Sequence, residues 1–185
     1  MPYDDSELIR RYQNGEVKAF EILVRKYQRQ LFTFLWRLVG NRQSAEDLFQ
    51  DTFLRMLDAL PMYKDDGRFV GWLFGIANNL AIDHLRRRRV RSDHLGDYER
   101  EFINAIDDEI SIEAELERLE AERFVESALQ CLPEKQRQVF LLRQHSGMSF
   151  KEIAETLHEP LNTVLSHMHY AVTKLRKQLR SVNVE

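Results

Sequence analysis

The chain has 185 residues and a formal net charge of -3, with 43% hydrophobic and 31% charged residues. Together with the few glycines and prolines, this composition is typical of a soluble, mostly helical protein that can bury a core. It contains no apolar run of about 18 residues, which excludes a membrane-inserted helix, and no secretory segment begins it. The single cysteine, Cys131, excludes an internal disulfide framework and fits the reducing cytoplasm.

The first half of the chain is predicted to form four helices. Residues 4–14 and 17–39 carry apolar side chains at helical spacing, and a glycine follows each run. Ser44 is expected to cap a third helix, which continues to Leu60. A fourth helix is expected over residues 69–91. Because the net charge is negative, a nucleic-acid partner would have to meet local basic patches.

The third predicted helix carries an acidic face opposite its apolar one. Solvated charges are the usual explanation of such a face. A sharper hypothesis is a docking surface for a protein partner, with Phe53 pointing partly outward as an apolar anchor.

The fourth predicted helix combines an aromatic ring, an amide and a run of arginines. Trp72, Asn79, Asp83 and Arg86 fall within an arc of about sixty degrees. The ring can stack on a base, the amide can read a base edge, and arginines hold phosphates. The preceding loop, 61–68, adds Tyr63, Lys64 and Arg68 beside the ring, where they suit an extruded base. The alternatives are a core helix with a solvated basic end and an ordinary connecting loop.

From residue 92 to about residue 122 the composition changes. Acidic side chains far outnumber the basic ones, Arg100 and Arg118, and apolar residues are sparse. This composition predicts a flexible acidic linker between two domains.

The C-terminal part is predicted to contain a helix-turn-helix. Helices are expected over about 116–131, 134–145 and 150–157, and the last begins with a capping box of Ser149 and Glu152. A tight turn then leads into a helix that continues to Leu179, which would enter the major groove. The alternative is a helical hairpin without a ligand.

No catalytic constellation is present in the sequence. There is no glycine-rich phosphate loop, no G-x-S-x-G and no H-E-x-x-H. His167 and His169 point in different directions on one helix and are poor joint metal ligands. We therefore expect neither an enzyme nor a cofactor or metal.

Taken together, these segments resemble a bacterial RNA polymerase sigma factor of the extracytoplasmic-function (ECF, group 4) type, in the sigma-70 family. The resemblance covers nearly the whole chain and is carried by AEDLFQDTFLRML (45–57), FVGWLFGIANNLAIDHLRRRR (69–89) and LPEKQRQVFLLRQHSGMSFKEIAETLHEPLNTVLSHMHYAVTKLRKQL (132–179). It implies an all-α fold of two small helical domains, 1–91 and 116–185, joined by an acidic flexible linker at 92–115. The C-terminal domain would be the helix-turn-helix.

The resemblance also implies partners and the residues that contact them. Docking on the β′ coiled coil of core RNA polymerase would use Asp47, Gln50, Asp51 and Phe53. Recognition and melting of the minus-ten promoter element would use Tyr63, Lys64, Arg68, Phe69, Trp72, Asn79, Asp83, Arg86 and Arg87. The C-terminal domain would bind the β flap and read the minus-thirty-five element with Lys151, Pro160, Asn162, Thr163, Leu165, Ser166, His169, Tyr170 and Lys174. An anti-sigma factor is the expected inhibitor.

The helix that is expected to enter the major groove departs from the family pattern. Members often carry basic residues where this chain has Leu165, His167 and Tyr170, and glycine where it has Asn162. Two other functions stay open at this point. One is a stand-alone helix-turn-helix regulator that binds duplex DNA without polymerase, and the other is a sigma-like interaction protein with weakened DNA binding.

Overall fold

The computed structural model describes residues 4–92 and 123–182, and all regular structure within these ranges is helical. The predicted all-α fold is confirmed. The elements are α1 (Asp5–Gln13), α2 (Val17–Val39), α3 (Arg42–Ala59), the 3-10 turn η1 (Leu60–Met62), α4 (Phe69–Ser92), a helical segment at 123–130, α6 (Glu134–Ser146), α7 (Phe150–Leu157) and α8 (Leu161–Val182). The predicted acidic linker, 92–115, lies outside the described residues apart from its first position.

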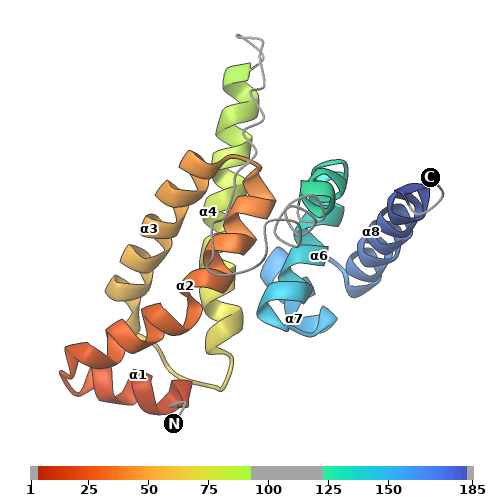
Figure 1. Ribbon diagram of the computed structural model, residues 1–185. Helices are drawn as coiled ribbons and strands as arrows, with labels where there is room; N and C mark the ends of the chain where they lie inside the picture. The colour runs from red at the N-terminus through yellow and green to blue at the C-terminus, as the bar shows by residue number, and fades with distance from the viewer. Residues whose placement is uncertain (1–3, 93–122, 183–185) are drawn as a thin grey trace, which may run out of the picture.

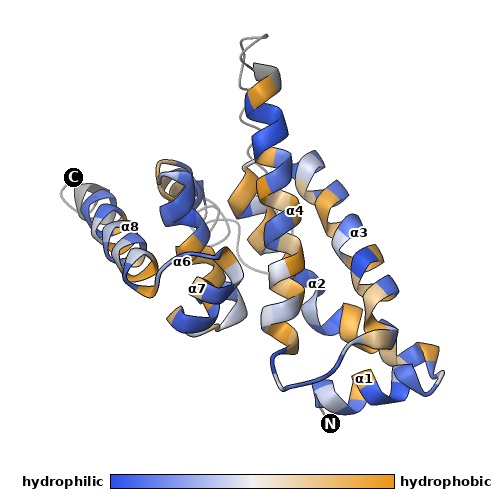
Figure 2. Cartoon of the chain, turned by 180° about the vertical axis from the view of Figure 1, so that it is seen from behind, coloured by the Kyte–Doolittle hydropathy of each residue, from blue (hydrophilic) through white to orange (hydrophobic). Residues whose placement is uncertain are grey.

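The N-terminal helices form a bundle in which α2, α3 and α4 pack side by side and α1 lies across their lower end (Figure 1). The apolar stripe of α2 is buried here, because its spacing places Leu23, Leu31 and Phe34 on one face. Phe34 meets Phe74 of α4 edge-on, with ring centroids 5.3 Å apart. The C-terminal end of α4 projects beyond the bundle and is mostly hydrophilic (Figures 1 and 2).

The start of α3 differs from the prediction. The helix begins at Arg42, and its N-cap is Asn41, whose Oδ1 accepts a hydrogen bond from the Ser44 amide at 2.8 Å. Ser44 is therefore the third residue of the helix and not its cap. Both residues are good caps, and the extended backbone at Asn41 decides between them: its φ is -141° and ψ 129°.

The C-terminal helices pack against the N-terminal bundle. Buried residues of the segment at 123–130 and of α6, among them Leu129, Val139 and Leu142, belong to the same continuous apolar core as those of α2 and α4. A buried hydrogen bond crosses this contact, from Gln138 Nε2 of α6 to Asn78 Oδ1 of α4 at 2.8 Å. Among the described helices, none has the length and apolar character needed to span a bilayer.

Candidate nucleic-acid interface

Three aromatic rings cluster at the start of α4 and in the loop before it. The Trp72 ring lies 4.5 Å from that of Tyr63 and 5.7 Å from that of Phe69. Trp72 is partly buried, whereas Phe69 is only 2% exposed. Phe69 therefore packs against the indole as a buried residue, and its burial is at odds with the prediction that its own ring contacts DNA. We call Tyr63, Trp72 and Asn79 the ledge.

The loop that carries Tyr63 is held in place by hydrogen bonds from α1. The side chain of Gln13, on α1, donates to the Leu60 and Tyr63 carbonyl oxygens at 3.0 and 2.8 Å. Burial, helped by the nearby carboxylates of Asp65 and Asp66, raises the pKa of the Tyr63 hydroxyl to about 12, so it stays protonated at neutral pH. The Tyr63 hydroxyl oxygen is itself buried and makes no hydrogen bond within the described residues, so Tyr63 contributes an apolar ring beside Trp72.

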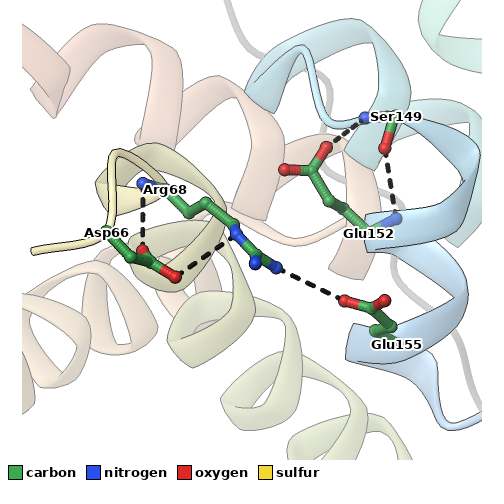
Figure 3. Close-up of polar contacts among 5 residues, drawn as sticks. All are labelled: Asp66, Arg68, Ser149, Glu152 and Glu155. Atoms are coloured by element: carbon green, nitrogen blue, oxygen red, sulfur yellow. Dashed lines mark hydrogen bonds and ion pairs between the residues drawn. The ribbon is translucent and has the colours of Figure 1, made fainter.

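The next turn of the loop fixes the position of Arg68. Asp66 Oδ1 accepts a hydrogen bond from the Arg68 amide at 3.2 Å, and Asp66 Oδ2 lies 3.3 Å from Arg68 Nε. Gly67 has a φ of +78°, a left-handed conformation that glycine adopts without strain. Arg68 then reaches across to α7, where its Nη1 lies 3.5 Å from Glu155 Oε2 (Figure 3).

The two neighbouring asparagines of α4 have opposite environments. Asn79 is exposed on the same side as Trp72, while Asn78 is 2% exposed and binds Gln138. Further along, Asp83 and Arg86 form an exposed ion pair at 3.2 Å. Arg86 and Arg87 are exposed near the projecting end of α4, where phosphates can reach them.

The ledge opens into a cavity of about 500 Å³ between α4 and α7. Lys64, Trp72 and Asn79 line it from the N-terminal half, and Met148, Glu155 and His158 line it from the C-terminal half. The sequence predicted the first set as a group, and the structure brings them together. The sequence did not predict Met148, Glu155 and His158, because the contact between the two halves joins residues that are far apart in the chain.

The helix-turn-helix has the local structure that the sequence predicts. Ser149 Oγ accepts from the Glu152 amide at 3.2 Å, and the Glu152 carboxylate accepts from the Ser149 amide at 2.7 Å (Figure 3). These bonds lower the pKa of Glu152. His158, with a φ of +53°, ends α7 in a left-handed turn, and the Pro160 carbonyl oxygen then accepts the Thr163 and Val164 amides at the start of α8.

One face of α8 is buried and the rest is open. Val164 and Ala171 are fully buried, while Leu165 and Tyr170 are 40% and 57% exposed. The remaining predicted reading residues are also accessible, although Thr163 is only partly so: Lys151, Pro160, Asn162, Thr163, Ser166, His169 and Lys174.

The acidic face of α3 carries a different apolar residue from the predicted one. Phe53 is only 9% exposed and packs edge-on against Phe49, with centroids 4.9 Å apart, so the prediction that it points outward is wrong. Leu54 is 58% exposed. It lies at i+7, i+4 and i+3 from Asp47, Gln50 and Asp51, in the middle of their stripe. The spacing of Leu54 can be read from the sequence, whereas the burial of Phe53 depends on its packing against Phe49.

This fold, with an aromatic and basic helix in one half and a helix-turn-helix in the other, defines a two-part DNA-binding transcription factor. Two family descriptions match it: Sigma-70 region 2 over residues 23–91, and Sigma-70, region 4 over residues 125–175.

Curated relatives match along almost the whole chain. The RNA polymerase sigma-H factor of Pseudomonas aeruginosa is 34% identical over 181 residues, covering 95% of this chain and 94% of that protein. The ECF RNA polymerase sigma-E factor of Haemophilus influenzae is 30% identical over 181 residues, covering 95% of each. Among solved structures, CnrH in complex with the cytosolic domain of CnrY matches with a TM-score of 0.68 and 27% identity, covering 96% and 97% of the two chains.

The chain therefore belongs to the sigma-70 family, among the ECF RNA polymerase sigma factors. It is an alternative sigma factor that directs transcription.

Proposed function

We propose that the chain binds core RNA polymerase through α3, opens promoter DNA on the ledge and locates the promoter with α8. The observation that carries this proposal is the partly exposed indole of Trp72, which packs against Phe69. It lines a cavity together with Lys64 and Asn79. A flat ring with a cation and an amide beside it suits an unstacked base and its phosphate.

In this proposal the docking surface consists of Asp47, Gln50, Asp51 and Leu54, and its partner is the β′ coiled coil of the polymerase. An exposed leucine surrounded by polar and acidic groups has the anatomy of a small interface, with an apolar centre and a polar rim. The C-terminal domain would bind the β flap. The anti-sigma complexes named among the structural neighbours support an anti-sigma factor as inhibitor.

The reading surface in this proposal is the open face of α8. Leu165 can contact a thymine methyl group, and His169 and Tyr170 can reach base edges or sugars. Lys174 and the helix-turn-helix residue Lys151 are placed for phosphates. A weakly basic surface on a chain of net charge -3 binds DNA poorly by itself. Docking on polymerase would make the second contact effectively intramolecular.

The test is reconstituted transcription. The purified chain is added to bacterial core polymerase and a candidate promoter, and run-off transcripts are measured beside a duplex gel shift without polymerase. We expect transcripts only with both proteins and weak binding in the gel shift. Tight duplex binding without polymerase would indicate a stand-alone regulator. Polymerase binding without transcription from any candidate promoter would indicate an interaction protein.

A further inference from the structure

The first helix of the chain lies against the loop that carries the ledge. The match to Sigma-70 region 2 begins at residue 23, so α1 lies ahead of the matched segment. In both views α1 lies beside the loop between α3 and α4 (Figures 1 and 2). Gln13, the last residue of α1, donates through its side-chain amide to the carbonyl oxygens of Leu60 and Tyr63, which are 47 and 50 positions further along the chain. The backbone on both sides of η1 is thereby tied to α1.

α1 is itself firmly held, so it can serve as a fixed support for the loop. Leu8 and Ile9 are 0% and 1% exposed and belong to the core of the N-terminal bundle. At the start of the helix, the Asp5 carboxylate accepts a hydrogen bond from the Tyr27 hydroxyl and lies 2.6 Å from Lys26 Nζ. Because displacing α1 would expose buried leucine and isoleucine to water, the last turn of the helix keeps its place.

The loop at 63–68 has no regular structure of its own. Its internal bonds are short-range: side-chain oxygens of Asp65 and Asp66 accept hydrogen bonds from amides two positions further on. The Tyr63 hydroxyl has no hydrogen-bond partner within the described residues, so this group does not anchor the ring. The place of the Tyr63 ring, 4.5 Å from that of Trp72, therefore depends on apolar packing and on where the Tyr63 backbone is held.

We propose that Gln13 is a positioning residue for promoter opening. Its amide holds the Tyr63 backbone, so that the Tyr63 ring already lies against Trp72 when an unstacked base arrives. The amide nitrogen has two hydrogens, one for each carbonyl oxygen, and a loop held in this way loses less conformational freedom on binding DNA. Gln13 is exposed, so it orders the loop and contributes little to the stability of the fold. The inference rests on the proposed function of the ledge.

Two substitutions of Gln13 separate its hydrogen bonds from the size of its side chain. Gln13→Leu is similar in size and has no donor. Gln13→Glu places a carboxylate against two carbonyl oxygens and should be the more damaging of the two. Gln28→Leu, at an exposed site on α2 outside the ledge and the proposed docking surface, is the matched control. Thermal unfolding checks that each variant keeps its fold.

Promoter opening by the variant holoenzymes is measured by permanganate reactivity of unpaired thymines. Gln13→Leu should reduce open complexes about three- to ten-fold, the effect of losing two exposed hydrogen bonds. Gln13→Glu should reduce them further, and Gln28→Leu should leave them unchanged. The affinity for core polymerase should stay that of the wild type in all three. Wild-type opening by both Gln13 variants would overturn the proposal.

A double-mutant cycle tests whether Gln13 acts through Tyr63. Tyr63→Ala removes the ring that Gln13 positions, so adding Gln13→Leu to it should reduce opening no further. If the double variant instead loses the product of the two single losses, Gln13 acts outside the ledge and the proposal is wrong.

Tryptophan fluorescence of the full chain gives a readout that does not need DNA. The chain has two tryptophans, so Trp36→Phe leaves Trp72 as the reporter. In that background, Gln13→Leu should raise the quenching of Trp72 by acrylamide toward the level seen with Tyr63→Ala. Quenching that rises with Tyr63→Ala and not with Gln13→Leu would show that the ring keeps its place without Gln13, against the proposal.

Failure of the ledge and failure of this inference give different results. If Tyr63→Ala and Trp72→Ala open the promoter as well as the wild type does, the proposed function of the ledge is refuted and the role of Gln13 falls with it. If both lose opening and the Gln13 variants do not, the ledge stands and only the positioning role of Gln13 is refuted.

Discussion

Leu54 gives the most quantitative test of the proposed polymerase-docking surface. Its side chain is 58% exposed in the free protein. Burying a whole leucine contributes about 1.5–3 kcal/mol, so covering the exposed part contributes about 1–1.7 kcal/mol. Leu54→Gln keeps a good helix former at this position and removes that contribution. We therefore expect the affinity for core polymerase to fall about five- to fifteen-fold.

Phe53 should behave in the opposite way. It is 9% exposed and packs against Phe49, so docking can bury almost nothing more of it. Phe53→Ala should lower the free energy of unfolding by about 3–5 kcal/mol. Val17→Gln is the matched control, since Val17 is another exposed aliphatic residue, 66% exposed at the first position of α2 and outside the proposed docking surface.

The assay is a titration of fluorescently labelled protein with core polymerase, beside thermal unfolding of each variant. We expect Leu54→Gln to bind core polymerase more weakly with an unchanged melting temperature, and Val17→Gln to bind it as tightly as the wild type. If Leu54→Gln binds polymerase as tightly as the wild type, the docking surface is placed on the wrong residues.

Three further predictions concern the C-terminal half. Lys174→Ala should weaken the binding of the holoenzyme to a minus-thirty-five duplex. It should also reduce the slope of log affinity against log salt concentration by about one. An unchanged slope in a salt titration would count against a phosphate contact at Lys174. Ser149→Ala removes the cap of α7 and should lower the melting temperature by about 2–4 °C, measured by circular dichroism. Burial, with the nearby Arg37 charge, lowers the pKa of His145 to about 4, so the folded form loses stability as pH falls from about 6.5 to 4, by up to about 3 kcal/mol. Urea titrations at pH 7 and 4.5 should show that His145→Gln loses less free energy of unfolding on acidification than the wild type does. Glu126 cannot account for this difference, because a carboxylate with a raised pKa costs stability as the pH rises and not as it falls.

Local features of this fold are readable from the sequence. The bounds of α2 and the capping box of α7 follow from spacing and cap chemistry within a few residues. The aromatic and polar members of the ledge are equally local, because Trp72 and Asn79 lie on one face of a single helix and the preceding loop is short.

The features that the sequence did not reveal depend on contacts between distant segments. Two adjacent asparagines look alike in sequence, yet only packing against α6 buries Asn78 and leaves Asn79 open. Phe69 and Phe53 are aromatic residues at the margins of their helical faces, and the neighbouring helices decide that both are buried. The ion pair of Arg68 with Glu155 joins residues 87 positions apart, which no local pattern predicts.

The most direct test of the ledge compares promoter opening with polymerase binding in Trp72→Ala and Asn79→Ala. Open complexes are measured with the variant holoenzymes by permanganate reactivity of unpaired thymines, and binding is measured by titration of core polymerase. Loss of a base stack costs about 1–3 kcal/mol, so Trp72→Ala should reduce open complexes at least several-fold. Core binding should stay unchanged for both variants. Equal loss of opening and of polymerase binding, or full opening without the indole and the amide, would contradict the account.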